Sequence, residues 1–572
     1  MKLICRLVQK RLRLFLTAVF FLLLETIADL MQPTYMSYIV DKGVKGQDVG
    51  RILSYGGMML LIAVTGAFCA VMRNLYSSRT SQLIGMDLRG EIYRKVQTLS
   101  FENIDRLQPA SIITRITNDV TQIQNFINGC MRIMLRAPIL CVGSVILIIV
   151  RTPEQTPLMF VILTIAAVLT GANVWFGYPR FGRLQKQLDA LNRVSREFLS
   201  SIRVVKAFHA EDQEEEKFGD ASEEYAAAGI SAMRVSAVFA PLLNLTVNLG
   251  IVVLLWISGT QDAARIGRVM ASVNYMTQIL FSLGMVSNIL NSAVRAVTSA
   301  GRVQEILDEK PAQKVSENPK SIRAEGALCF KEVSFRYAGT SRDALTKIDF
   351  TVRAGETVGI IGPTGSGKTT LVNLVPRFYD AAEGRILLDG TDIMEMDPGN
   401  LRSIIAVVPQ KPLLFSGTIA ENLRWGDEKA EESQMERAAR IACADEFIKA
   451  LPHGYETRLG QGGVNLSGGQ KQRLSLARAL VRKPKILILD DCTSALDADT
   501  ESRVLKGIRE ETDGITVLIV SQRISTVMRA DQILCLEDGN LRGSGTHEEL
   551  LKGCGAYRAI YVSQMGGEPD GR

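Results

Sequence analysis

Six stretches of roughly 20 residues, each dominated by apolar side chains, lie within the first half of this 572-residue chain. A helix of that length matches the hydrocarbon thickness of a bilayer. The pattern therefore predicts a helical membrane domain in this half. The predicted spans cover residues 15–40, 52–73, 129–150, 157–178, 236–258 and 268–291.

Basic residues before the first span predict its orientation. No acidic residue precedes Glu25, so the amino terminus is expected to stay inside. No small-residue cleavage site follows the first apolar run, which favours a retained span over a signal peptide. The segments between spans two and three and between spans four and five each exceed 50 residues, so we expect both to face the cytoplasm as continuing helices. The basic residues that precede the first span are Lys2, Arg6, Lys10, Arg11 and Arg13.

Several polar side chains lie inside the predicted spans, where burial is unfavourable. Glu25, Asp29 and Gln32 share one helix face by i, i+4, i+7 spacing. They could line a water-filled pathway or bind a cationic substrate. Alternatively, Asp29 and Gln32 lie near the outer headgroups and Glu25 makes a structural bond between helices. Arg132 and Arg136, near the cytoplasmic end of the third span, are predicted to snorkel toward the headgroups.

The overall composition excludes some classes of protein. Apolar residues make up 47% of the chain and the mean hydropathy is +0.12, which suits a membrane half joined to a soluble half. The net charge is only +6, and no basic patch is interleaved with aromatic residues, so nucleic acid is not an expected partner. Nine scattered cysteines without C-x-x-C spacing predict reduced thiols and neither a zinc site nor a disulfide framework.

The second half contains a phosphate-binding motif. A predicted strand, "ETVGII" (Glu356 to Ile361), runs directly into "GPTGSGKTT", which satisfies G-x-x-x-x-G-K-[ST] in its strand-to-helix context. The glycines let backbone N–H groups point at phosphate oxygens, Lys368 reaches the β- and γ-phosphates, and the Thr369 hydroxyl can coordinate magnesium. The predicted ATP-binding residues of this loop are Gly362, Pro363, Thr364, Gly365, Ser366, Gly367, Lys368, Thr369 and Thr370.

Two further motifs follow the loop. The apolar strand "KILILD" brings Asp490 to the same edge of a parallel sheet, where its carboxylate can hold magnesium. Between loop and strand, "LSGGQKQRLSLARAL" places a Gly-Gly turn before an amphipathic helix. An ordinary helix cap by Ser467 would explain that turn structurally.

The position of LSGGQ between the phosphate loop and the Asp490 strand resembles the signature of ABC transporter ATPases. The resemblance implies that Tyr337 in "FRYAG" stacks on adenine, and that Gln410 in "VVPQKPLLFSGTI" contacts magnesium and the attacking water. It also implies that "SALD" (Ser494 to Asp497) faces a partner, and that Thr369, Gln410 and Asp490 hold magnesium.

The likeness extends over nearly the whole chain. Together with the six spans, "IITRITNDV" (Ile112 to Val120) and "RVVKAF" (Arg203 to Phe208) resemble half-transporters of the bacterial ABC exporter type. The implied fold is a membrane domain of six long transmembrane helices followed by an α/β P-loop ATPase domain. The implied boundaries are a membrane domain at 1–307, a linker at 308–325, the ATPase domain at 326–565 and a flexible tail at 566–572, with coupling helices near 101–115 and 205–217.

In this family two ATPase domains sandwich two ATP molecules, and the signature of one chain completes the P-loop site of the other. Here that role falls to Leu466, Ser467, Gly468, Gly469 and Gln470.

Three positions depart from the family pattern. Asp491 stands where the family usually has the glutamate that polarises the attacking water, and Gln522 stands where the switch loop usually has histidine. Gln461 replaces a frequent glutamate, with no effect that we can assign. An aspartate is one methylene shorter than a glutamate and displaces the base by roughly 1.5 Å, when a misplacement of about 1 Å can lower a rate on the order of 100-fold.

Two such changes in one site predict ATP binding without efficient turnover. We therefore expect a heterodimer, in which a second, similar half-transporter supplies the competent glutamate and histidine. The expected function is ATP-driven export of amphipathic, drug-like compounds by alternating access, in a bacterial inner or plasma membrane with the ATPase domain cytoplasmic. The alternatives are a homodimeric exporter, a lipid flippase or an importer on the same fold, or an ATP-binding membrane sensor.

Overall fold

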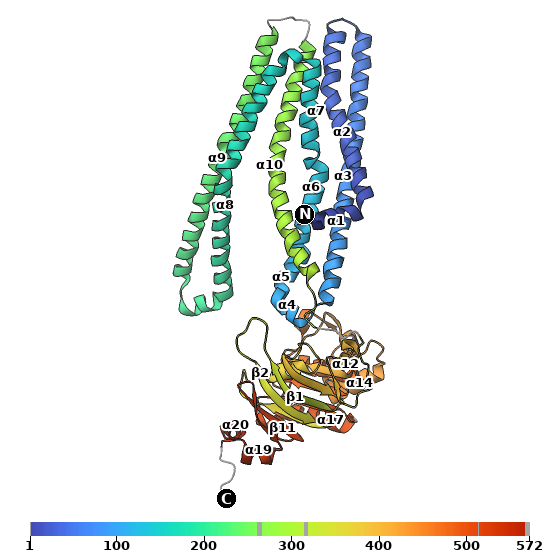
Figure 1. Ribbon diagram of the computed structural model, residues 1–572, viewed down its shortest axis with the longest axis vertical. Helices are drawn as coiled ribbons and strands as arrows, with labels where there is room; N and C mark the ends of the chain where they lie inside the picture. Colours follow the sequence, from blue (N-terminus) through green and yellow to red (C-terminus); the bar gives the residue numbers. More distant parts are fainter. Residues whose placement is uncertain (1, 260–265, 314–317, 513, 567–572) are drawn as a thin grey trace. The chain divides into compact units, whose positions relative to one another are not determined.

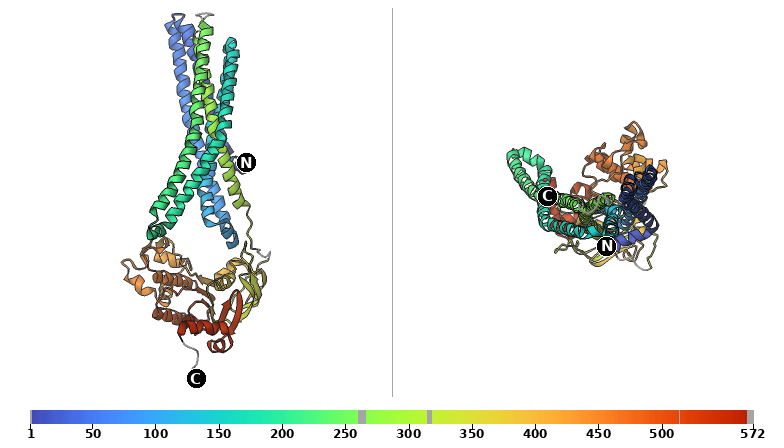
Figure 2. Two further views of the ribbon diagram at one scale, coloured as in Figure 1. Left: turned by 90° about the vertical axis from the view of Figure 1, so that its left-hand side faces the viewer. Right: turned by 90° about the horizontal axis from the view of Figure 1, so that it is seen from above.

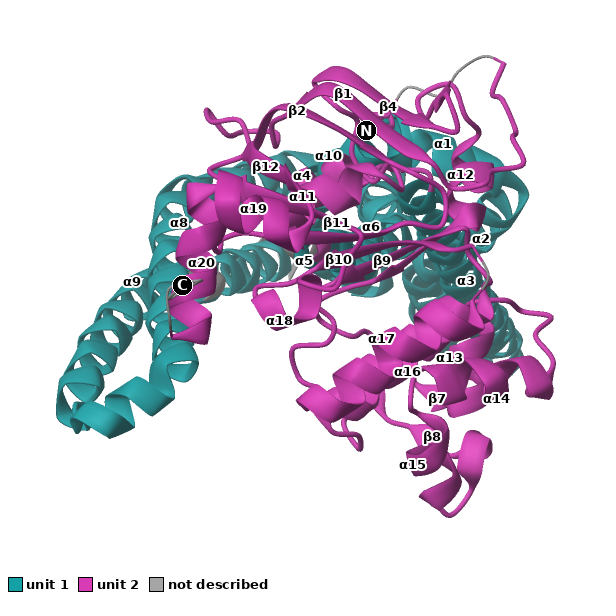
Figure 3. Cartoon of the chain, turned by 90° about the horizontal axis from the view of Figure 1, so that it is seen from below, with its two compact units in different colours: residues 1–97, 110–308 teal, residues 98–109, 309–572 magenta. Residues whose placement is uncertain are grey.

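The computed structural model describes residues 2–259, 266–313, 318–512 and 514–566, which fall into two compact units (Figure 3). The first unit comprises Met1–Gln97 and Ala110–Asp308, and the second comprises Thr98–Pro109 and Glu309–Arg572. The short segment 98–109 thus belongs with the carboxyl-terminal half, although both of its chain neighbours belong to the helical unit.

The first unit is built of helices, three of which have 49, 53 and 49 residues (α3, α8 and α9; Figure 1). A helix of 53 residues is about 80 Å long, far more than a bilayer requires. The elements are α1 (Lys2–Lys10), α2 (Leu12–Tyr38), η1 (Ile39–Val44), α3 (Val49–Gln97), α5 (Pro109–Thr114), η2 (Arg115–Asp119), α6 (Val120–Gly129), η3 (Cys130–Met134), α7 (Arg136–Arg151), η4 (Pro153–Gln155), α8 (Thr156–Phe208), α9 (Glu211–Gly259) and α10 (Ile266–Asp308).

Five helical segments of the described chain are long and apolar enough to cross a membrane. These segments contain the first four predicted spans and all but the last two residues of the fifth, and the sixth, 268–291, lies within α10. The segments are Leu12–Val44, Val49–Gln97, Pro109–Arg151, Pro153–Phe208 and Glu211–Trp256.

Helices of this unit pack as neighbours along their lengths. Contacts join α2 to α3 and α8 to α9, and α10 packs against α7, α2 and α6 (Figures 1 and 2). The segment near 205–217, predicted as a coupling helix, is not a separate element. It forms the end of α8, a turn at His209 and Ala210, and the start of α9, because His209 adopts the left-handed conformation that ends α8.

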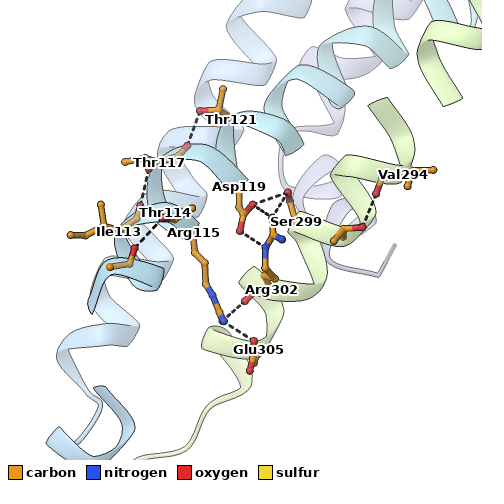
Figure 4. Close-up of polar contacts among 12 residues, drawn as sticks. Ile113, Thr114, Arg115, Thr117, Asp119, Thr121, Val294, Ser299, Arg302 and Glu305 are labelled. Carbon is orange, nitrogen blue, oxygen red and sulfur yellow. Dashed lines mark hydrogen bonds and ion pairs between the residues drawn. The ribbon is translucent and has the colours of Figure 1, made fainter. Parts of the chain in front are cut away.

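The "IITRITNDV" segment includes η2, a short π-helix that is bonded to the end of α10 (Figure 4). The fully buried carboxylate of Asp119 accepts hydrogen bonds from Ser299 Oγ at 2.9 Å and Arg302 Nε at 2.8 Å. Arg115 Nη1 donates to the Arg302 carbonyl at 2.9 Å and pairs with Glu305 at 2.8 Å. These bonds fasten the segment that follows α5 to the last turns of α10, where buried charges are compensated by partners.

The second unit begins with α4 (Phe101–Leu107), which a capping box at Ser100 opens. Two sheets follow. The antiparallel sheet has the order β2 (Leu345–Val352), β1 (Leu328–Phe335), β4 (Glu383–Leu388), β5 (Thr391–Asp392). The mainly parallel sheet has the order β12 (Asn540–Gly545), β11 (Gln532–Glu537), β3 (Thr357–Ile361), β10 (Thr516–Val520), β9 (Ile486–Asp490), β6 (Ile405–Val408), in which β12 is antiparallel.

Three apolar cores among the described residues hold these sheets. One lies between the two sheets and includes residues of α11. The second packs α13, α14 and α16 against the parallel sheet, and the third packs α18, α19 and α20 against the same sheet. The remaining elements are α11 (Lys368–Leu374), α12 (Pro398–Ile404), β7 (Gly417–Thr418), α13 (Ile419–Arg424), α14 (Glu432–Ile441), α15 (Asp445–Ala450), η6 (Gly454–Glu456), β8 (Arg458–Leu459), η7 (Gln461–Gly463), α16 (Gly468–Val481), α17 (Ala498–Glu511), α18 (Ile524–Val527), α19 (His547–Gly553) and α20 (Gly555–Met565).

Strands β3, β9 and β10 are continuous apolar runs, which is typical of parallel strands covered on both faces. Because β10 pairs in parallel with both β3 and β9, their carboxyl ends meet at one edge of the sheet. The phosphate loop and the loop with Gln522 follow two of these ends, and Asp490 is the last residue of β9. In the predicted linker and tail, residues 314–317 and 567–572 lie outside the described residues.

Candidate nucleotide site

A cavity of about 480 Å³ lies at this edge of the parallel sheet. Its volume is within the usual range for ligand sites. Most of the predicted nucleotide-site residues line it together. They are Tyr337, Thr364, Gly365, Ser366, Gly367, Lys368, Thr369, Thr370, Gln410, Asp490, Asp491 and Gln522.

The phosphate loop is shaped by glycines that adopt positive φ. Gly367, the N-cap of α11, has φ +96°, and a Cβ there would lie 2.8 Å from the Ala344 carbonyl oxygen. Lys368 Nζ lies inside the loop, donating to the carbonyl oxygens of Gly362 at 2.8 Å and Pro363 at 2.7 Å. Burial lowers the pKa of the Lys368 ammonium, and the charges of the two aspartates oppose that change.

The two predicted magnesium ligands at the sheet edge touch each other. Thr369 Oγ1 donates to Asp490 Oδ1 at 3.0 Å. Asp490 is buried, and this burial raises the pKa of its carboxyl group, with the bond from Thr369 acting in the opposite direction.

Asp491 lies beside them with a left-handed backbone, φ +46°. Its Oδ2 accepts a hydrogen bond from Gln410 Nε2 at 3.2 Å, so the two residues predicted to act on the attacking water are in contact. Burial raises the pKa of the Asp491 carboxyl, against the effects of Gln410 and Lys368.

Gln522 also lines the cavity. Its loop is held by hydrogen bonds from residues that no sequence motif marks. Gln564 of α20 donates from Nε2 to the Gln522 carbonyl at 2.7 Å and accepts from the Ile524 N–H at 2.8 Å. Arg523 Nη2 donates to the Ser494 carbonyl at 3.2 Å, which ties this loop to the SALD segment. No local sequence pattern marks Gln564, because its partners lie about 40 positions earlier in the chain.

Tyr337 also lines the cavity. Its hydroxyl shares a hydrogen bond with Thr370 Oγ1 at 3.1 Å, and its ring meets Phe335 edge-on at 4.8 Å between centroids. Tyr379, also missed from the sequence, meets the same ring edge-on at 5.4 Å.

The LSGGQ residues do not line this cavity. Ser467 caps α16 in a capping box with Gln470, accepting from its N–H at 3.3 Å and donating its own N–H to Oε1 at 2.9 Å. Ser467 and Gly468 are exposed. The N-terminus of this 14-residue helix is thus open to a second molecule.

Four charged residues of the membrane unit, on α2, α3 and α7, form a connected cluster. Arg73 Nε lies 2.5 Å from Glu25 Oε2, and both side chains are buried. Arg136 contacts Glu25 at 3.3 Å and Asp29 at 2.6 Å. The prediction that Arg136 snorkels is therefore wrong, because two carboxylates on α2 pair with it. The interpretation that Glu25 makes a structural bond between helices is confirmed. The side chain of Arg132 is exposed.

Comparisons with known proteins agree with this architecture. A family model described as "ABC transporter transmembrane region" matches residues 15–283, and one described as "ABC transporter" matches residues 345–494. YfiB of Bacillus subtilis (strain 168), named an uncharacterized ABC transporter ATP-binding protein, is 39% identical over 557 residues, covering 96% of each chain. An ATP-dependent lipid A-core flippase of Pseudomonas aeruginosa is 32% identical over 521 residues, covering 90% of this chain and 86% of the flippase.

The solved structure of a bacterial Atm1-family ABC exporter with ATP bound has a TM-score of 0.79 and 26% identity, covering 98% of this chain and 99% of that one. Both predicted halves of the fold, the helical membrane domain and the α/β ATPase domain, are thereby confirmed. The chain belongs to the ABC transporter family, as an ATP-hydrolysing exporter half-transporter whose membrane domain and ATPase domain are fused in one polypeptide.

Proposed function

We propose that this chain is one subunit of a heterodimeric exporter that moves amphipathic compounds out of a bacterial cell across its inner or plasma membrane. Its own P-loop site holds ATP and Mg²⁺ with slow turnover, and its LSGGQ completes a competent site on a second half-transporter. The main support is the cavity itself, in which Asp491 and Gln522 together occupy the positions usually held by glutamate and histidine.

The oxygen atoms at the sheet edge fit magnesium. Thr369 and Asp490 supply one hydroxyl and one carboxylate in contact, and the Gln410 side chain lines the same cavity. Mg²⁺ commonly binds proteins through one or two carboxylates, with substrate phosphates and waters filling the other positions. When bound, the ion would neutralise charge on the β- and γ-phosphates.

The geometry of Asp491 supports the proposal of slow hydrolysis. General-base assistance typically contributes ~10²–10⁴-fold to a rate and requires the base to reach the attacking water. The shorter Asp491 side chain is held by Gln410 on its Oδ2, so it cannot extend further into the cavity without losing that bond. Gln522 is neutral and adds no positive charge beside the transferring phosphoryl group.

The exposed signature supports a two-chain assembly. Ser467 and Gly468 at the start of α16 lie outside this chain's own cavity, where their backbone N–H groups and the helix dipole can meet a γ-phosphate held by another chain. In the described chain this signature is intact, while the P-loop site has the two substitutions. A partner with glutamate and histidine therefore gives one fast site and one slow site.

The chain purified alone tests this proposal. We expect it to bind ATP with Mg²⁺ but to hydrolyse it at less than about 1% of a typical enzyme turnover of ~10 s⁻¹. Phosphate release and equilibrium ATP binding would be measured on the same preparation. K368A serves as the control without ATP binding. Turnover as fast as that of an ordinary exporter would instead support the homodimeric alternative.

A lipid flippase is the second candidate, since one relative is named a lipid A-core flippase. Inside-out vesicles with the assembled transporter distinguish the possibilities. ATP-dependent accumulation of an amphipathic dye supports export, and loss of preloaded dye supports import. Movement of labelled lipid without dye transport supports the flippase, and absence of any transport favours a membrane sensor.

A further inference from the structure

A series of aromatic rings runs through the second unit from α4 to the nucleotide cavity. Phe101, the first residue of α4, lies 4.6 Å from Phe378 and 6.3 Å from Tyr379 between ring centroids. Tyr379 in turn meets Tyr337 at 5.4 Å with the ring planes 80° apart. Edge-to-face pairs have a preferred geometry, so a displacement of one ring changes the favoured position of the next.

Two rings of the series also make hydrogen bonds. The Tyr379 hydroxyl donates to Asp105 Oδ2 of α4 at 2.6 Å, and the Tyr337 hydroxyl shares a bond with Thr370 Oγ1 of the phosphate-loop helix at 3.1 Å. Burial and the bond to Asp105 raise the pKa of Tyr379 above its ordinary value, so its hydroxyl remains a donor at neutral pH. The ring and hydroxyl of Tyr379 thus contact two different elements at once.

Neighbouring contacts hold both α4 and the Tyr379 segment in place. Asn103 donates from Nδ2 to the Lys310 carbonyl at 3.0 Å and accepts from the Ala312 N–H at 2.9 Å. On the other side, the fully buried Arg377 bonds to Asp380 at 2.7 Å. Tyr379 therefore lies between two restrained segments, and a movement of α4 is expected to act on its ring.

We infer that Tyr379 is a positioning residue that couples the position of α4 to the orientation of the Tyr337 ring, and thereby to the binding of the nucleotide base. This role of Tyr379 rests on the proposed nucleotide site, in which Tyr337 stacks on adenine. Tyr379 does not line the cavity and touches neither Lys368 nor Asp490 among the described contacts, so its effect is limited to the base. Phosphate binding should not depend on it.

Substitution of the ring tests the link to the base. In the full chain in lipid nanodiscs, Tyr379→Leu is expected to weaken ATP binding about three- to tenfold, the usual range for loss of an aromatic pair. Binding of inorganic triphosphate should change by less than about twofold, because Tyr379 itself contacts no phosphate-loop residue among the described contacts and reaches Thr370 only through Tyr337. Phe350→Leu, which breaks the stacked Phe330–Phe350 pair at 4.5 Å elsewhere in this unit, is the matched control and should affect neither ligand.

A double-mutant cycle tests the link to α4. D105A should weaken ATP binding in the parent chain about two- to fivefold but have no further effect in the Y379F background, because the shared hydrogen bond is already gone. Tyr455→Phe is the matched control, since it removes the similar bond from Tyr455 to Asp445 at 2.8 Å outside the cavity.

Binding of ATP and of inorganic triphosphate distinguishes failure of the proposed nucleotide site from failure of the proposed role of Tyr379. A parent chain that binds neither ATP nor triphosphate would refute the proposed nucleotide site itself. A parent chain that binds both, with Tyr379→Leu lowering the two affinities equally or changing neither, would overturn only the role of Tyr379. Additive effects of D105A and Y379F would likewise exclude coupling to α4.

Discussion

Asp491→Glu combined with Gln522→His is expected to raise ATP hydrolysis by this chain about 100-fold or more. The longer side chain moves the carboxylate roughly 1.5 Å toward the attacking water, and a correctly placed base alone typically contributes ~10²–10⁴-fold. Histidine adds a group that can carry positive charge near the phosphoryl group. Phosphate release from the full chain in membrane vesicles, at saturating ATP and Mg²⁺, measures the change.

The single variants show whether both positions matter. Each alone should give only part of the increase, because groups that act together in one site are not additive. Adding Lys368→Ala to the double variant should return the rate to background, which assigns the released phosphate to this P-loop. If the double variant binds ATP normally and hydrolyses no faster than the parent, then Asp491 and Gln522 are not the cause of slow turnover.

Removal of Glu25 is expected to destabilise the membrane unit more than removal of Arg73. Glu25→Leu leaves the buried Arg73 guanidinium without its carboxylate partner, and an uncompensated buried charge typically destabilises by about 3–5 kcal/mol. Arg73→Leu leaves Glu25 with a second arginine, Arg136, at 3.3 Å, so its effect should be smaller. The rate of thiol labelling at Cys69, which is buried on α3 one turn before Arg73, reports local opening of this unit.

An exposed ion pair provides the control for this comparison. Arg51→Leu breaks the pair with Asp48, in which both side chains are solvent-exposed, and surface pairs contribute about 0–1 kcal/mol. It should leave Cys69 labelling unchanged. Equal labelling rates in the Glu25→Leu and Arg73→Leu variants would contradict the view that Arg136 compensates Glu25.

The sequence allowed the two-part fold to be predicted because both halves depend on local regularities. Bilayer thickness sets the length of an apolar span, and alternation of short buried strands with helices produces a parallel sheet. The phosphate loop and Asp490 could be assigned to one sheet edge because the carboxyl ends of parallel strands lie there together. The predicted residues that line the nucleotide cavity follow from that rule.

Contacts between distant parts of the chain were not predictable in this way. The α2 carboxylates could be placed on one helix face by their spacing, but their partners Arg73 and Arg136 lie on other helices. In the segment near 205–217, where a coupling helix was predicted, the structure ends α8 at Phe208 and starts α9 at Glu211.

The sequence alone determined the fold class, the phosphate loop and the two unusual residues at positions 491 and 522, because each is encoded in a short continuous segment. Only the tertiary structure revealed that Glu25 is neutralised by arginines, and that Tyr379 joins Asp105 of α4 to the Tyr337 ring. The hydroxyl of Tyr379 and its partner Asp105 are 274 positions apart, and periodicity extends over only a few turns or strands. Such pairings arise when distant elements pack, and no local pattern specifies which side chains will meet.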